Sequence, residues 1–288
     1  MTHAWRHWLS SPAGAYLLEW EQDQVDALVA DKVASRIAAK DFTLWGKDAE
    51  AESSIRLGWV TSAADSQKLV DSILALRDEF KSKGVTRFVL CGMGGSSLAP
   101  EVITRTAGVE LVVLDSTNAD QVGAALAGDL HKTAIVVSSK SGSTVETDSQ
   151  KRVFEKAFTD AGIDKTDRIV IVTDPGSPMQ KAAEADGYRI FNADPTVGGR
   201  YSALTAFGLV PSGLAGADIQ ALLDSANSVA DLLASDDASN PALVLGAALG
   251  ATPGEYGLRD KIGIVNDGTS IVGFGDWAEQ LIAESTGK

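Results

Sequence analysis

The stretch that decides the fold is TAIVVSSKSGSTVET, residues 133–147. Its first six residues are mostly β-branched and almost continuously apolar, which favours a strand buried on both faces, as in a parallel sheet. Residues 139–144 then gather four hydroxyls and one lysine around Gly142, before a helical pattern begins. The stretch therefore predicts a buried parallel strand followed by a polar loop suited to binding a ligand.

Similar short runs recur on either side, separated by amphipathic segments of helix length. We expect strands at Arg87 to Cys91, Glu110 to Asp115, Thr133 to Ser138, Arg168 to Thr173 and Tyr188 to Phe191. Strands that alternate with helices predict an α/β fold, a parallel sheet flanked by helices in three layers. Right-handed crossovers place the loop after each strand along one edge of the sheet, where ligands of open α/β folds bind.

The sequence predicts four parts along the chain, from the periodicity of its apolar residues. They are a helical N-terminal segment (1–84, helices from Gln22 to about Lys40 and Ala63 to Lys83), a first sheet domain (85–215), a helical connection (216–260, helices from Ala217 to Asp236 and Ala242 to Leu249) and the start of a second sheet domain (261–288, a strand from Lys261 to Asn266 and a helix from Trp277 to Glu284). Because one strand and one helix cannot close a sheet domain, we expect the second domain to be truncated at Lys288.

Composition limits the compartment and the partners. A formal charge of −14 over 288 residues weighs against nucleic acid and anionic membranes as partners. Cys91 is the single cysteine and the three histidines are scattered, so neither an intrachain disulfide nor a zinc site is expected. The N-terminus lacks the apolar core of a secretory signal, and the longest apolar run, residues 242–251, is about half a membrane span. These features predict a cytoplasmic protein without a bound metal.

A glycine-rich turn, CGMGGSSL at residues 91–98, follows the first expected strand. Its unpaired backbone N–H groups would point at an anion above the turn. Two other interpretations stay open: a structural turn without a ligand, or a dinucleotide fingerprint completed by Asp115 at the end of the next strand. Against the fingerprint, Ser97 stands where a glycine normally lets helix and strand pack closely.

The hydroxyl-rich turn also has two interpretations. A phosphomonoester needs many short donors around its oxygens, and Ser and Thr hydroxyls, backbone N–H groups and one ammonium supply them at a helix N-terminus. Helix capping is the alternative, because Glu146 follows Ser143 by three residues, as in a capping box. One cap needs one hydroxyl rather than four, so the phosphate interpretation is favoured.

Two further segments carry candidate groups. In DPTVGGRYS, residues 194–202, two glycines before Arg200 would let its guanidinium turn back over the sheet edge and stabilise negative charge. A surface arginine after a glycine turn is the alternative. In EQLIAESTGK, residues 279–288, Glu284 lies near the expected end of a helix, where a carboxylate opposes the helix dipole. Glu279, five residues earlier, would lie on another face of that helix, so the two do not form a carboxylate pair.

Together the four segments resemble the phosphoglucose isomerase family, whose sugar isomerase (SIS) fold binds a phosphosugar at the edge of a parallel sheet. The matching motifs, in the family's order and spacing, are Gly-x-Gly-Gly-Ser ending at Ser96, Ser-Lys-Ser-x-x-Thr at 139–144, Gly-Gly-Arg-Tyr-Ser at 198–202 and Glu-Ser-x-Gly-Lys at 284–288. The segment RIAAKDFTLW, residues 36–45, further resembles isomerases that are fused behind a transaldolase.

This resemblance implies an aldose–ketose isomerase that interconverts glucose 6-phosphate and fructose 6-phosphate through an enediolate, without a metal or redox cofactor, and as a homodimer when complete. The implied roles are binding of the 6-phosphate by the Gly95 backbone and by Ser96, Ser139, Lys140, Ser141 and Thr144, stabilisation of the enediolate by Arg200, and proton transfer by Glu284. A non-catalytic phosphosugar-binding module is the alternative, since it needs only the first two loops.

The chain also departs from the family pattern. The family opens the sugar ring with a histidine contributed across the dimer and a lysine much later in the sequence, and a chain that ends at Lys288 contains neither position. His131 is not a substitute, because it is expected directly before the third strand. Ser97 stands where the family has an acid. Dual-specificity relatives that also accept mannose 6-phosphate tend to carry another residue at Lys140, so this lysine favours glucose 6-phosphate.

Overall fold

The computed structural model describes residues 22–250, 261–265 and 268–287. The chain divides into two compact units, residues 1–54 with 228–265 and residues 55–227 with 266–288. This boundary differs from the four expected parts, because it falls within the expected helical segment 1–84. The two units are described separately.

The regular secondary structure among the described residues of the first unit is helical. A turn at Asp31 and Lys32 divides the expected N-terminal helix into residues 22–30 and α3 (Val33–Ala38). The remaining elements are η1 (Phe42–Trp45), η2 (Lys47–Ala49), α13 (Ala230–Leu233) and α14 (Pro241–Leu249), with α4 (Glu50–Arg56) running from this unit into the second. The carboxylate of Asp236 accepts hydrogen bonds from the Ser35 hydroxyl at 2.6 Å and the Ser35 backbone N–H at 3.0 Å. These bonds join the two chain segments that form the unit.

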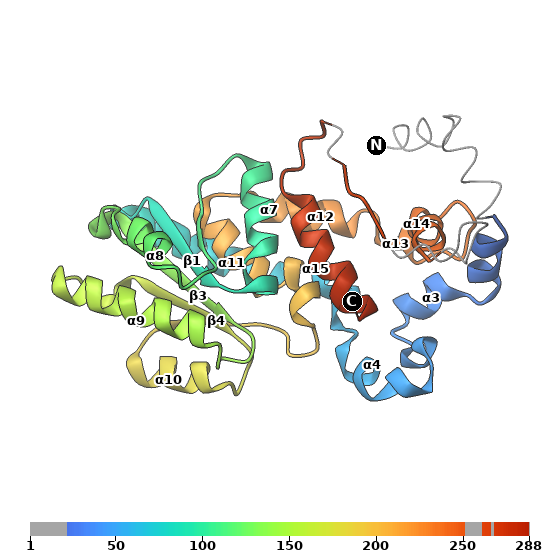
Figure 1. Ribbon diagram of the computed structural model, residues 1–288, viewed down its shortest axis with the longest axis horizontal. Helices are drawn as coiled ribbons and strands as arrows, with labels where there is room; N and C mark the ends of the chain where they lie inside the picture. Colours follow the sequence, from blue (N-terminus) through green and yellow to red (C-terminus); the bar gives the residue numbers. More distant parts are fainter. Residues whose placement is uncertain (1–21, 251–260, 266–267, 288) are drawn as a thin grey trace. The chain divides into compact units, whose positions relative to one another are not determined.

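The second unit contains all five of the expected strands in one parallel sheet (Figure 1). They are β1 (Arg87–Gly92), β2 (Val112–Leu114), β3 (Thr133–Ser139), β4 (Ile169–Thr173) and β5 (Arg189–Asn192), in the order β2-β1-β3-β4-β5. The chain places β2 on one side of β1, and it places β3, β4 and β5 in succession on the other side. The direction in which strands are added to the sheet therefore reverses between β1 and β3. Ligands of open α/β sheets bind at such a reversal, outside the carboxyl ends of the strands.

Helices cover both faces of this sheet. The helices of the unit are α5 (Ser62–Asp65), α6 (Gln67–Ser82), α7 (Leu98–Ala107), α8 (Ala119–Leu126), α9 (Val145–Asp160), α10 (Pro178–Asp186), α11 (Ala206–Ala215), α12 (Ile219–Asn227) and α15 (Phe274–Thr286). Short 3₁₀ turns are η3 (Gly58–Thr61), η4 (Gly94–Ser96), η5 (Leu130–Lys132), η6 (Lys165–Asp167) and η7 (Gly199–Leu204). None of the described helices combines the length and the apolar character needed to cross a membrane.

The strands alternate their side chains between two cores. Leu90 and Val136 belong to the core that α6 and α11 cover, whereas their neighbours Val89 and Val137 belong to the core that α9 covers with Phe154. These side chains are fully buried, so the strands are apolar on both faces. The expected three-layer SIS-type arrangement is therefore confirmed.

The strand expected from Lys261 to Asn266 is wrong for residues 261–265, which have no regular secondary structure. Asn266 lies outside the described residues. The apolar side chains of Ile262, Ile264 and Val265 are exposed, and no described strand pairs with this segment. A strand needs a neighbour to satisfy its backbone N–H and C=O groups, and an apolar sequence pattern cannot supply one. The expected helix from Ala217 to Asp236 is also divided, into α12 and α13.

The thiol of Cys91 offers a test of the sheet's integrity. Cys91 lies in β1 beneath the glycine-rich loop, and its burial raises the pKa of the thiol to about 12. Because the thiolate is the reactive species, we expect the native chain to react with Ellman's reagent far more slowly than the chain unfolded in denaturant. Equal rates for the native and the unfolded chain would show that β1 is not buried.

Candidate functional site

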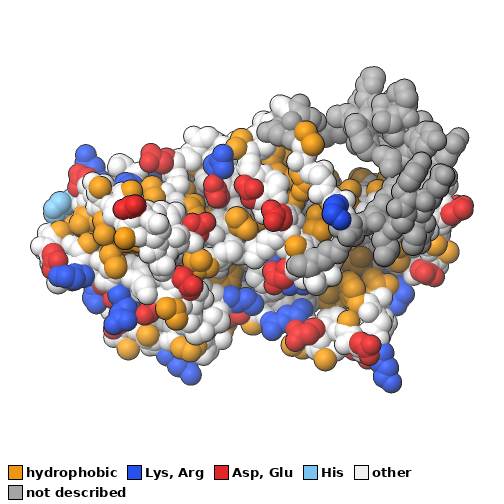
Figure 2. Space-filling view, viewed as in Figure 1, with side chains coloured by type: hydrophobic (Ala, Val, Ile, Leu, Met, Phe, Trp, Pro, Cys, Tyr) orange, Lys and Arg blue, Asp and Glu red, His pale blue; other side chains and the backbone are white. Residues whose placement is uncertain are grey.

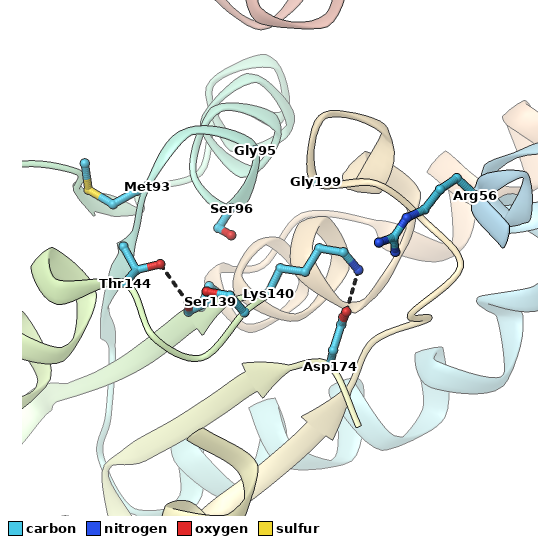
Figure 3. Close-up of a pocket in the computed structure, with 11 residues that line it drawn as sticks. Arg56, Met93, Gly95, Ser96, Ser139, Lys140, Thr144, Asp174 and Gly199 are labelled. Carbon is cyan, nitrogen blue, oxygen red and sulfur yellow. Dashed lines mark hydrogen bonds and ion pairs between the residues drawn. The ribbon is translucent and has the colours of Figure 1, made fainter. Parts of the chain in front are cut away.

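The register of the sheet brings three loops to one place. Gly92 of β1 pairs with Ser138 of β3, and Ser139 pairs with Thr173 of β4, so the chain leaves these three strands side by side. A cavity of about 440 Å³ opens there (Figure 3). Its lining residues are Arg56, Met93, Gly95, Ser96, Ser138, Ser139, Lys140, Ser141, Thr144, Asp174 and Gly199. The structure thus brings together all six residues that the sequence predicted for phosphate binding.

Hydroxyls organise the loop after β3. The Ser139 hydroxyl accepts a hydrogen bond from the Gly142 backbone N–H at 3.1 Å and lies 3.1 Å from the Thr144 hydroxyl (Figure 3). The Ser141 hydroxyl accepts from the backbone N–H and the hydroxyl of Ser143. Thr144 is the N-cap of α9, and its side chain makes no capping hydrogen bond. The capping interpretation is therefore wrong, and the start of α9 keeps its positive dipole end toward the loop.

The turn after β1 and the loop at residues 194–202 are in close contact at two glycines, Gly95 and Gly199. A side chain at Gly95 would place its Cβ 2.5 Å from the carbonyl oxygen of Gly199, closer than any carbon atom can approach. The Ser202 hydroxyl closes the contact, with its oxygen 2.6 Å from the carbonyl of Gly199 and 3.3 Å from that of Gly95. Because Gly199 lines the cavity, this contact also positions the next residue, Arg200, at the cavity's rim.

Arg200 and Glu284 form an ion pair beside the cavity, although neither lines it. The Arg200 Nη1 atom lies 3.1 Å from Oε1 of Glu284, which α15 carries near its C-terminal end. Nε of Arg200 donates to the Ser285 hydroxyl at 2.8 Å, and the guanidinium stands 4.8 Å from the centre of the Tyr201 ring. Trp59 stacks on Tyr201, with 5.4 Å between the two ring centres. Hydrogen bonds thus hold the edge of the guanidinium, and the Tyr201 ring contacts its face. These contacts fix the direction of the guanidinium.

Lys140 reaches across the cavity to a carboxylate that the sequence analysis missed. Its Nζ lies 2.5 Å from Oδ2 of Asp174, and both side chains are mostly buried (Figure 3). Asp174 directly follows β4, so the rule that identified the other loops would have pointed to it. Thr173 donates to the carbonyl of Ser139 at 2.7 Å and thereby fixes the two loops against each other.

Arg56 enters the cavity from outside the sheet, and no motif in the sequence indicates it. Its Nη1 donates to the carbonyl of Pro195 at 2.8 Å, which directs the guanidinium toward the cavity (Figure 3). The next residues continue this attachment, because Leu57 forms an antiparallel bridge with Val197 and Gly58 donates its N–H to Thr196. We refer to residues 56–59 as the strap.

Metal-ligating residues are not grouped in this part of the protein. Among the described residues, no three His, Cys, Asp or Glu side chains are placed to hold a metal ion. His131 lies in η5 directly before β3, at the opposite end of that strand from the cavity.

The sheet, its order and the polar cavity at its carboxyl edge define an α/β protein of the sugar isomerase (SIS) type. The family model described as phosphoglucose isomerase matches residues 64–288. The chain belongs to the phosphoglucose isomerase family, and this assignment does not favour the dinucleotide interpretation of the first loop. The likeness of residues 36–45 to transaldolase fusions stays a prediction.

Relatives in two haloarchaea cover most of the chain. It is 34% identical to a probable glucose-6-phosphate isomerase of Haloarcula marismortui, over 78% of this chain and 51% of the relative, and 32% identical to one of Natronomonas pharaonis, over 91% and 62%. A solved structure of a hypothetical protein from Thermus thermophilus superposes with a TM-score of 0.74 at 28% identity, covering 93% of this chain and 62% of that one. The chain thus spans between half and two thirds of the length of these relatives.

The contact between Gly95 and Gly199 can be tested from both sides. We expect Gly95→Ala to lower the free energy of unfolding by about 1–3 kcal/mol, because the added carbon meets backbone that must move. Gly199→Ala is the matched control, since a Cβ there meets no atom within 4 Å. Thermal denaturation measures both variants. Equal losses of stability would contradict the contact.

Proposed function

We propose that this chain is the phosphosugar-binding part of a glucose-6-phosphate isomerase, which interconverts glucose 6-phosphate and fructose 6-phosphate and is a homodimer when complete. The observation that carries the proposal is the cavity, where two loops place all six predicted phosphate-binding residues around one space, with the Arg200–Glu284 pair at its rim. Family membership supports the same activity. A cytoplasmic location stays a prediction.

The groups around the cavity suit the two ends of the substrate. Hydroxyls of Ser96, Ser139, Ser141 and Thr144, the backbone at Gly95 and the Lys140 ammonium would donate to the phosphate oxygens, assisted by the N-terminus of α9. The sugar would then extend past Gly199 toward the rim. There Glu284 would remove the proton from C2 and return it to C1, while the fixed guanidinium of Arg200 stabilises the enediolate. A 1,2-proton shift of this kind needs a placed base and charge stabilisation, and no redox cofactor takes part.

Binding can be tested on the 288-residue chain itself. Glucose 6-phosphate at about one hundred times its dissociation constant should stabilise the fold by about 2.7 kcal/mol, seen as a rise in melting temperature that glucose does not produce. Lys140→Ala should reduce the rise. Lys156→Ala, at an exposed position of α9, removes the same charge and should preserve it. A chain whose melting temperature ignores glucose 6-phosphate would defeat the proposal.

Catalysis is tested by the rate of isomerisation, and the decisive variant is Glu284→Gln. We expect it to lower the isomerisation rate by a factor on the order of 10²–10⁴, the usual contribution of one general base. Exchange of the C2 proton with solvent deuterium, followed by NMR, should fall equally. Glu279→Gln is the control, because this exposed glutamate lies on the same helix. An unchanged rate for Glu284→Gln would instead favour a phosphosugar-binding module without catalysis.

A further inference from the structure

A carboxylate in a phosphate site calls for a reason. Asp174 lines the cavity together with the hydroxyl loop, and its negative charge opposes the approach of a phosphate. Lys140, 2.5 Å away, offsets that charge. A pocket built for phosphate alone would do better with the ammonium and without the carboxylate.

The carboxylate of Asp174 is not saturated by the protein. Its Oδ2 accepts from Lys140, and its Oδ1 is buried and accepts no hydrogen bond from any described residue. An ionised carboxylate can accept about four hydrogen bonds, so most of this capacity is unused. Since Oδ1 is buried and Asp174 lines the cavity, a donor carried by a ligand would approach the carboxylate at Oδ2, the oxygen that also accepts from Lys140.

The polar side chains around the cavity differ in what they can offer. Arg56 and Lys140 can only donate, and the hydroxyls of the first two loops can donate to phosphate oxygens. The phosphate group of a fully ionised monoester has no donor of its own, whereas every sugar hydroxyl has one. Asp174 is the single carboxylate among the described residues that line the cavity, so it is the strongest acceptor available to a sugar hydroxyl there.

From this division of donors and acceptors, and resting on the function proposed above, we propose that Asp174 is a specificity residue that accepts a hydrogen bond from a hydroxyl of the sugar. It makes the cavity select a phosphorylated sugar over a phosphate monoester without hydroxyls. Lys140 then has two roles, because it contributes positive charge to the phosphate site and also keeps the carboxylate tolerable beside a phosphate. The Thr173 hydroxyl, bonded to the Ser139 carbonyl, sets the distance between the two loops that carry this pair.

The test compares two ligands on the 288-residue chain by isothermal titration calorimetry. Asp174→Asn keeps the shape of the side chain and removes its charge. We expect the dissociation constant for glucose 6-phosphate to rise about tenfold, equivalent to about 1.4 kcal/mol. The constant for hexyl phosphate, a monoester without hydroxyls, should stay unchanged or fall, because a repulsive charge has gone. Asp160→Asn, at the exposed far end of α9, makes the same change in net charge and should alter neither constant.

Other outcomes overturn the inference. If Asp174→Asn weakens both ligands by one factor, the residue acts through Lys140 alone, and if it weakens neither, the sugar does not contact it. If the variant fails to fold, hexyl phosphate, which lacks hydroxyls, can be compared with glucose 6-phosphate on the unmodified chain, and equal affinities contradict the inference. Failure of the unmodified chain to bind either phosphate ester would overturn the proposed function and the inference together, whereas binding with an unaltered preference in Asp174→Asn overturns the inference alone.

Discussion

The backbones of Gly95 and Gly199 meet at a separation that excludes every side chain, and the arrangement of the site depends on this contact. It joins the turn after β1 to the loop that carries Arg200, although more than a hundred residues separate them in the chain. Gly199 then borders the cavity while the next residue reaches the ion pair with Glu284. Glycine is needed at position 95 for space rather than for an unusual backbone angle. One close approach thus holds the cavity and the candidate catalytic pair in a fixed relation.

An acidic protein has to build an anion site from local groups. The chain carries a formal charge of −14, and Figure 2 shows acidic side chains spread among basic and apolar ones on the face in view. The cavity contains short-range donors: hydroxyls, backbone N–H groups and the N-terminus of α9, whose N-cap side chain makes no capping hydrogen bond. Such donors act over a few ångströms and leave the overall field unchanged. Few charged side chains line the cavity, and one of them, Lys140, is paired with the carboxylate of Asp174.

The sequence predicted those features that depend on local pattern. Strands buried on both faces leave apolar runs such as Ile169 to Val172, and residues that follow such runs must meet at the carboxyl edge of a parallel sheet. The candidate phosphate-binding residues were predicted in this way. Features that depend on distant partners were missed or wrong. Arg56 reaches the cavity because the strap pairs with residues 195–197, and residues 261–265 are apolar yet have no described strand beside them. Neither the position of Arg56 nor the lack of a neighbouring strand at residues 261–265 can be predicted from nearby residues in the sequence.

The span of the Arg200–Glu284 pair has a consequence for how the protein is made. The turn after β1, the hydroxyl loop, Asp174 and the strap's partners are all present once synthesis has passed Gly199, whereas the glutamate comes 85 residues after that glycine. Chains begin to fold from the N-terminal side as they emerge from the ribosome. We expect the cavity and its candidate phosphate-binding residues to form first in a nascent chain, and the candidate base, Glu284, to be added last. A growing chain would therefore pass through a stage in which it contains the candidate phosphate site but lacks the candidate base.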